Sequence, residues 1–290
     1  MQVSAFWIKL KFISDYERNY MSVHPQALSE VPPNATPTVW QARRKRVIFT
    51  VLPFIVLIMV WQLIAATQPT YVFPSLQIVI KTIYGFVLDG SLWPASFATI
   101  KSVAIGAVAS LVLGTLIGFA LARFESMTSP LLNFVQTVPY VVWALMSLIW
   151  FGLTQTSVVF TIVVAAFPIV SFNVASGLKN IDQNLLGMAQ SVRANRVMTL
   201  RHIYFPTLTP YLISASRTML GMCWKISVLA ELFAGGAGGG GVGYNLFVAW
   251  EFSRPNEVFA WTVWLVLLMM VSDRLFIVPF EMLATRWKKP

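Results

Sequence analysis

Long hydrophobic stretches separated by polar segments dominate the chain after residue 46. Six of these stretches approach or reach the roughly 20 residues that cross about 30 Å of hydrocarbon as an α-helix. The pattern therefore predicts an all-α, polytopic membrane protein with six transmembrane helices. The predicted spans are residues 47–67, 98–122, 130–151, 157–176, 208–233 and 258–278.

The polar segments outside these spans have different characters. Residues 1–46 end in four consecutive cations, which predicts a partly flexible cytoplasmic tail ahead of a transmembrane domain at residues 47–285. The amphipathic stretch Leu76–Leu88 is predicted to lie on the membrane surface. Residues 177–207 interleave cations with apolar residues in a helical pattern that is too polar to span. Residues 286–290 form a short basic C-terminus.

The composition agrees with a membrane protein and the charge indicates its topology. Hydrophobic residues make up 57% of the chain and charged residues 11%, against about a quarter in soluble domains. The net charge is +10, but the cations flank the hydrophobic stretches and form no separate basic domain, which argues against nucleic acid as a partner. With six spans, fifteen of the 21 Lys and Arg residues lie on the side of the N-terminus, and the loops opposite hold only Lys81 and Arg254. The positive-inside rule then places both termini in the cytoplasm.

Catalytic and metal-binding signatures are missing from the sequence. His24, His202 and the lone Cys223 make no metal motif, and there is no nucleophile elbow or two-histidine helix. Seven glycines between Gly235 and Gly243 suggest a phosphate loop, but no Lys-Ser or Lys-Thr follows and no hydrophobic strand precedes. This segment is read either as an outer-mouth or re-entrant turn that changes shape during gating, or as a passive linker.

The sharpest motif lies in residues 187–206. Ile203-Tyr204-Phe205-Pro206 closes it and resembles the end of the pattern Glu-Ala-Ala, three residues, Gly, nine residues, Ile-x-Leu-Pro of permeases of binding-protein-dependent ABC importers. The alignment places Gly187 at the Glu and Arg193 at the Gly, so both signature residues are replaced. The resemblance implies that the coupling segment, residues 180–206, docks on an ATPase. The residues expected to take part are Ala189, Ser191, Arg193, Ala194, Arg196, Thr199, Leu200, Arg201, Ile203 and Pro206.

Further short motifs follow the order of the same family from about residue 50 to 285. They resemble the subgroup that handles nitrate, sulfonates, taurine and bicarbonate. These motifs are Phe73-Pro74-Ser75, Ile149-Trp150-Phe151-Gly152, Phe167-Pro168-Ile169, Leu220-Gly221, Trp224-Lys225, Ala230-Glu231 and Gly241-Val242-Gly243-Tyr244. The resemblance implies the type I importer permease fold with a cytoplasmic coupling helix, and Gly241, Gly243 and Tyr244 as part of the outer loop or gate.

An amphipathic helix outside the bundle suits insertion into a groove of a soluble ATPase. The alternative from the charge pattern alone is a basic helix lying on anionic lipid.

Charges within the predicted fifth span are candidates for a translocation pathway, because charge inside a membrane is costly. At 100° per residue they fit a stripe of roughly 120° on one face of the helix. The alternative is pairing with neighbouring helices, with a structural role. The stripe comprises Ser214, Arg217, Gly221, Lys225 and Glu231.

The resulting hypothesis is the permease subunit of an ATP-driven importer in a bacterial inner membrane, with a small anion such as a sulfonate or taurine as its solute. The resemblance implies two cytoplasmic ATP-binding subunits that hold ATP and Mg, an extracytoplasmic solute-binding protein, and a second copy of this chain. No cofactor is expected in this chain itself. The competing function is an autonomous secondary transporter or channel, which typically requires coupling-ion residues and an internal inverted repeat; neither is seen.

Overall fold

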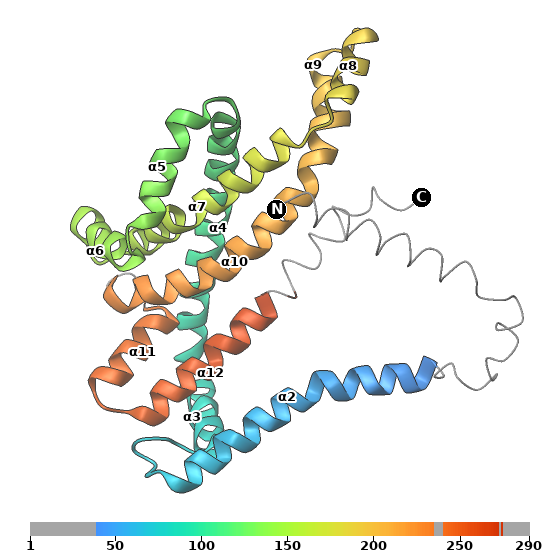
Figure 1. Ribbon diagram of the computed structural model, residues 1–290. Helices are drawn as coiled ribbons and strands as arrows, with labels where there is room; N and C mark the ends of the chain where they lie inside the picture. The colour runs from blue at the N-terminus through green and yellow to red at the C-terminus, as the bar shows by residue number, and fades with distance from the viewer. Residues whose placement is uncertain (1–38, 235–239, 273, 275–290) are drawn as a thin grey trace, which may run out of the picture. The chain divides into compact units, whose positions relative to one another are not determined.

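The computed structural model describes residues 39–234, 240–272 and 274, and its regular elements in that part of the chain are all helical (Figure 1). The prediction of an all-α protein is confirmed. The chain divides between Trp61 and Gln62 into two units, and helix α2 crosses this division. The elements are α2 (Val39–Thr67), α3 (Leu76–Leu88), α4 (Leu92–Arg123), α5 (Glu125–Thr137), α6 (Tyr140–Phe151), α7 (Gln155–Lys179), α8 (Gln183–Ser191), α9 (Arg196–Thr199), a π-helix η2 (Leu200–Tyr204), α10 (Phe205–Ala234), α11 (Val242–Glu251) and α12 (Pro255–Ser272).

Helices α4 and α7 pack closely because α4 presents small residues to α7. Three glycines separated by eight and four residues lie on this face, and none has room for a side chain. Small residues at such spacing let two helix backbones approach closely in a membrane. A Cβ would lie 2.5 Å from Ile162 at Gly106, 2.6 Å from Val170 at Gly114 and 2.7 Å from Val174 at Gly118.

Helix α10 shares the main core with α4 and α7. Ala215, Met219 and Cys223, which are spaced by four residues on α10, are all buried in this cluster. A separate small core joins α3, α4, α11 and α12, where Trp261 stacks on Phe86 with ring centroids 4.5 Å apart. Helix α10 thus buries one face in the main core and leaves another face exposed.

Three described helices are long and apolar enough to cross a membrane: α4, α7 and α12. The pair α5 and α6 raises this number to four if the two helices together form one span. Helix α10 has 30 residues but contains Arg217, Lys225 and Glu231, and it is not among them. The count of six spans therefore stays a prediction.

The predicted span at residues 130–151 is not one continuous helix. Helix α5 ends at Thr137, α6 begins at Tyr140, and the two are bent by 90°. The cause is Pro139, whose ring disfavours the helical conformation in the preceding residue. Val138 accordingly has an extended backbone, with φ −68° and ψ 125°.

Helix α3 has the bounds predicted from its amphipathic pattern. Val79 is fully buried, whereas Ile80, Tyr84 and Leu88 are exposed. Residues 1–38, most of the predicted tail, and the basic C-terminus at 286–290 lie outside the described residues. So do residues 235–239 of the glycine-rich segment.

Candidate functional site

Residues 180–206, which we call the arm, project from the ends of α7 and α10 (Figure 1). Asp182 caps α8 by accepting a hydrogen bond from the Asn184 N–H at 2.8 Å, and Asn195 caps α9 through the Met198 N–H at 2.7 Å. Side-chain oxygens of Asp and Asn commonly satisfy the free N–H groups at helix starts. The sequence therefore encodes two short helices separated by a turn.

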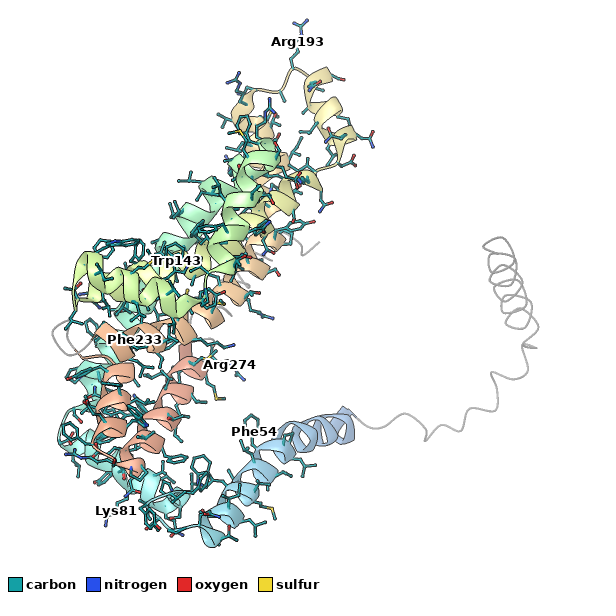
Figure 2. All side chains as sticks on the ribbon, turned by 60° about the vertical axis from the view of Figure 1, so that its left-hand side comes forward. Phe54, Lys81, Trp143, Arg193, Phe233 and Arg274 are labelled. Atoms are coloured by element: carbon teal, nitrogen blue, oxygen red, sulfur yellow. The ribbon has the colours of Figure 1, made fainter. Side chains whose placement is uncertain are left out.

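Arg193 lies at the tip of this turn (Figure 2). Its backbone has φ +51°, the left-handed region that glycine adopts at helix ends. The Arg193 N–H donates to the Gln190 carbonyl and the Ala194 N–H to the Ala189 carbonyl, each at 2.9 Å, which closes α8. The turn at the position of the family's glycine is thus formed with an arginine in its place.

The arm buries none of the side chains of its three helical segments. Several large apolar side chains of the arm are exposed, including Met188 at 66%, Val192 at 73% and Leu200 at 54%. Exposed apolar patches of this kind mark interaction surfaces. The predicted coupling residues are distributed as follows: Ser191, Arg193, Arg196, Leu200, Arg201 and Pro206 are exposed, and Ala189, Ala194, Thr199 and Ile203 are half-buried.

The π-helix η2 joins the arm to α10 without a break. Its widened turn is one residue longer per hydrogen-bonded ring than an α-helix, and such turns occur often at functional sites. Leu200 and Ile203 both belong to it. The arm and α10 are therefore continuous, so movement of the arm can be transmitted to α10.

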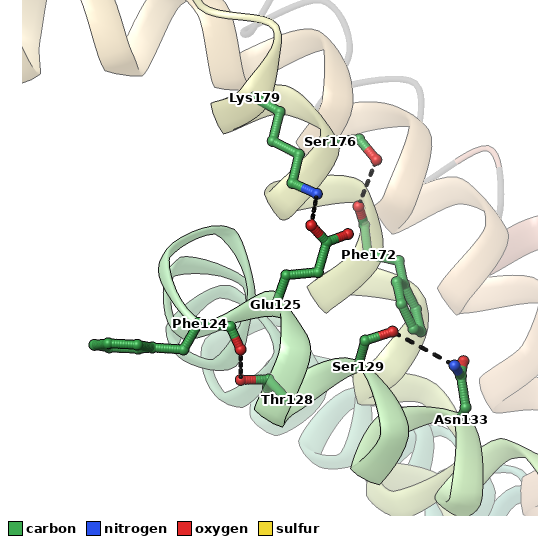
Figure 3. A network of polar contacts seen from close by, with 8 residues as sticks. All are labelled: Phe124, Glu125, Thr128, Ser129, Asn133, Phe172, Ser176 and Lys179. Atoms are coloured by element: carbon green, nitrogen blue, oxygen red, sulfur yellow. Dashed lines mark hydrogen bonds and ion pairs between the residues drawn. The ribbon is translucent and has the colours of Figure 1, made fainter.

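The base of the arm is tied to α5 by an ion pair (Figure 3). Lys179 Nζ, in the last turn of α7, lies 2.6 Å from Glu125 Oε2, in the first turn of α5. Each charge also sits at the helix end whose dipole favours it. Both side chains remain about half exposed, and the two residues are far apart in sequence, so the sequence offered no sign of this contact.

Glu231 makes a second candidate site, in the interior near the start of α11. Its side chain is 4% exposed. Oε2 accepts hydrogen bonds from Thr99 Oγ1 and from the Gly243 N–H, both at 2.9 Å, and Oε1 accepts one from Ser227 Oγ at 3.2 Å. Thr99 Oγ1 in turn accepts the Val242 N–H at 2.9 Å. A single carboxylate thereby joins α4, α10 and the N-terminus of α11, where free N–H groups favour an anion.

The glycines of the Gly241-Val242-Gly243 motif are explained by this carboxylate. A Cβ on Gly241 would collide with the Glu231 carboxyl group, and one on Gly243 would lie 2.7 Å from the Val228 carbonyl oxygen. Tyr244 is half-buried and lines a small pocket beside Glu231 together with Ser102. The motif is therefore glycine-rich here for close approach of the backbone.

The predicted pathway residues of α10 differ in their exposure. Ser214, Arg217 and Lys225 are exposed on α10 and Gly221 is half-buried with open space around it. Glu231 is enclosed and accepts hydrogen bonds from residues of α4 and α11. Sequence reasoning missed Thr99 and Ser227, although Ser227 precedes Glu231 by four residues and so shares its face of the helix.

No group of three or more His, Cys, Asp or Glu side chains suited to a metal occurs in the described part of the chain.

Comparison with known proteins identifies the family. Residues 110–286 match the model of the binding-protein-dependent transport system inner membrane component. The nitrate import permease protein NrtB of Leptolyngbya laminosa is 29% identical over 74% of this chain and 79% of its own length. The taurine transport system permease protein TauC of Escherichia coli K12 is 28% identical over 71% of this chain and 77% of its own length.

A solved structure of the MetNI methionine ABC transporter in an inward-facing conformation shares the fold. Its TM-score is 0.50 at 16% identity, covering 63% of this chain and 93% of that one. The predicted resemblance to ABC importer permeases is confirmed, and the named relatives are transport permeases, not enzymes. The chain belongs to the family of binding-protein-dependent transport system inner membrane components, as a multi-pass permease subunit of the inner membrane.

Proposed function

We propose that this chain forms the membrane path of an ATP-driven importer for a small anion, and that its arm receives the movement of a separate ATPase. The observation that carries the proposal is the arm itself: two short helices without a buried side chain, apolar on their surface, and continuous with α10. A short exposed apolar helix is the form that a groove on a partner recognises.

The partners follow from the family and from the charges of α10. Two ATP-binding subunits hold ATP and Mg in the cytoplasm, and a solute-binding protein delivers the solute on the other side. A second copy of this chain completes the path, because Lys225 is an exposed charge within α10 and charge facing hydrocarbon is costly. Both termini and the arm lie on the cytoplasmic side in this topology.

The solute is a small anion, with taurine or another sulfonate as the first candidate. Arg217 and Lys225 lie exposed on the same helix, and two cations lining an aqueous path attract anions. Ser214 and Gly221 belong to the same stretch of α10. The named relatives are a nitrate import permease protein and a taurine transport system permease protein, which supports the same class of solute for this chain. Gly241, Gly243 and Tyr244 shape the outer end of the path.

The competing function, a secondary transporter or channel that works alone, is separated by reconstitution. Liposomes containing this chain alone are expected to be silent, and radiolabelled taurine uptake is expected only with the ATP-binding subunits, ATP and the solute-binding protein. Uptake by the chain alone would overturn the proposal.

The docking role of the arm is tested by Leu200→Asp, which places a carboxylate on an exposed apolar position of the arm. We expect loss of ATPase association with normal membrane insertion. Ile203→Asp should act in the same direction. Leu88→Asp, at the end of α3 and 70% exposed, is the matched control and should leave association unchanged.

A further inference from the structure

Apart from Asp182, which caps α8, the charged side chains of the arm are all cationic. From Gln183 to Phe205 the chain has no Asp or Glu and carries Arg193, Arg196 and Arg201, with His202 beside them. All three arginines are exposed, and none forms an ion pair with a residue that the structure describes. In the pattern that this segment resembles, Gly187 stands at the position of the acid and Arg193 at the position of the glycine.

Arg193 occupies a backbone conformation that disfavours it. At φ +51° a glycine fits freely, whereas any other residue brings its Cβ close to the following carbonyl group. Residues held in such conformations are concentrated at functional positions. The Arg193 side chain, at the tip of the arm, is therefore a candidate for contact with a partner.

The arm extends beyond the N-terminal end of α10. Helix α10 has 30 residues and is about 45 Å long at 1.5 Å per residue, which exceeds the roughly 30 Å of hydrocarbon. The arm continues from the N-terminal end of α10, and Arg193 marks its far end (Figure 2). With α10 as the predicted spanning helix, the tip of the arm lies beyond the hydrocarbon, where a soluble partner can reach it.

Apolar and cationic side chains alternate around the tip. Val192 precedes Arg193, and Val197 follows Arg196; both valines are more than 70% exposed. An apolar floor with carboxylates on its rim matches this surface, because an arginine and a carboxylate form strong, often bidentate, hydrogen-bonded pairs. A neutral or basic groove would leave three arginines unpaired.

We propose that the arm binds in an acidic groove of the ATPase subunit, and that Arg193 is a residue that determines which ATPase subunit pairs with this permease. The inference rests on the proposed function, since it names the chemistry of that partner. Opposite charge across the interface speeds association, and like charge on a non-cognate ATPase excludes it.

The test uses the full-length permease in nanodiscs of phosphatidylcholine and the purified ATP-binding subunit that restores ATP-driven uptake to the wild-type chain. Affinity is measured from about 50 to 500 mM NaCl, where screening increases strongly. We expect Arg193→Glu to weaken binding about tenfold or more at low salt, while Arg193→Lys stays within about threefold of wild type. Arg193→Gly, which removes both the charge and the backbone strain, should lose affinity and part of the salt dependence.

Arg254→Glu reverses an exposed charge in the α11–α12 loop and is the matched control, with unchanged affinity expected. Rescue of Arg193→Glu by an Asp→Lys or Glu→Lys change in the groove would support the pairing most directly. Wild-type affinity of Arg193→Glu, or binding that does not respond to salt, would overturn the inference while leaving ATPase docking intact. A defect seen only in uptake with phosphatidylglycerol present, with normal ATPase affinity, would assign the tip to anionic lipid instead. If no ATPase subunit binds the wild type, the proposed function itself fails.

Discussion

The arm and the surroundings of Glu231 both place charge in a chain that is mostly apolar, but they treat that charge differently. Glu231 is 4% exposed and its carboxylate accepts three hydrogen bonds from three segments of the same chain. The arginines of the arm are exposed and make no ion pair among the described residues. A buried charge must be satisfied internally, whereas an exposed one beside apolar residues is available to a partner. The first site joins three helices of this chain, whereas the second leaves cationic and apolar side chains exposed.

The largest effect is expected from Glu231→Ala. Removing the carboxylate leaves the Gly243 N–H, Thr99 and Ser227 without their acceptor, at a cost of about 3 kcal/mol in the free energy of unfolding. Thermal unfolding in detergent should show this loss. Glu231→Gln keeps an acceptor oxygen of similar size and should lose less.

The same pair of variants separates a structural role of Glu231 from a role in the pathway. If Glu231→Gln retains stability and ATPase association yet abolishes uptake, Glu231 contacts the solute and belongs to the pathway after all. A parallel loss of stability and uptake supports the structural role.

Gly243→Ala is the next largest change. The added methyl group meets the Val228 carbonyl oxygen at 2.7 Å and Glu231 Cβ at 2.8 Å, so α11 must shift from its place. We expect a loss of about 2 kcal/mol, typical of overpacking, measured again by thermal unfolding. Gly221→Ala is the matched control, because nothing lies within 4 Å of the added atom. Equal effects at the two positions would show that helix propensity, and not the Glu231 contact, selects glycine.

What could be predicted from sequence depended on whether the cause was local. The bounds of α3 follow from its own amphipathic pattern. The break at Pro139 is also local and could have been predicted from the restriction that proline places on the preceding residue. Likewise, Gly106, Gly114 and Gly118 carried a spacing signal for close packing that hydropathy alone does not detect.

The hydrogen-bond partners of Glu231 could not be predicted from any single segment of the sequence. The sequence identified Glu231 as a charge within the predicted fifth span and placed it on one face of that helix with Arg217 and Lys225. The partners Thr99 and Gly243 are 132 and 12 residues away, and only the packing of α4 and α11 against α10 brings them within hydrogen-bond distance. The arm was easier to recognise, because an exposed motif has to be specified by its own residues.

Arg193→Gly should stabilise the arm locally, whereas the substitutions at Glu231 and Gly243 lower stability. Glycine relieves the left-handed conformation at φ +51°, and we expect a gain of about 1 kcal/mol in local stability. Hydrogen exchange of the α8 amides should slow accordingly, while the global unfolding temperature stays constant because the helical segments of the arm bury none of their side chains. Gly187→Ala, which has open space at its Cβ, controls for helix propensity in α8. Unchanged or faster exchange in Arg193→Gly would mean that the arginine side chain stabilises the turn within this chain, which would place the arm closer in character to the Glu231 site.

The smallest effect is expected from the ion pair between Glu125 and Lys179. Both side chains are about half exposed, so their attraction is weakened by water despite the 2.6 Å separation. A double-mutant cycle with Glu125→Gln and Lys179→Met should give a coupling of about 0.5 kcal/mol that declines with added salt. The pair Arg254 and Glu257, at 3.4 Å and three residues apart, serves as the reference and should couple no more strongly. A coupling several times larger would mean that the base of the arm is held as firmly as the Glu231 site, and the movement passed from an ATPase would then reach α5 as well as α10.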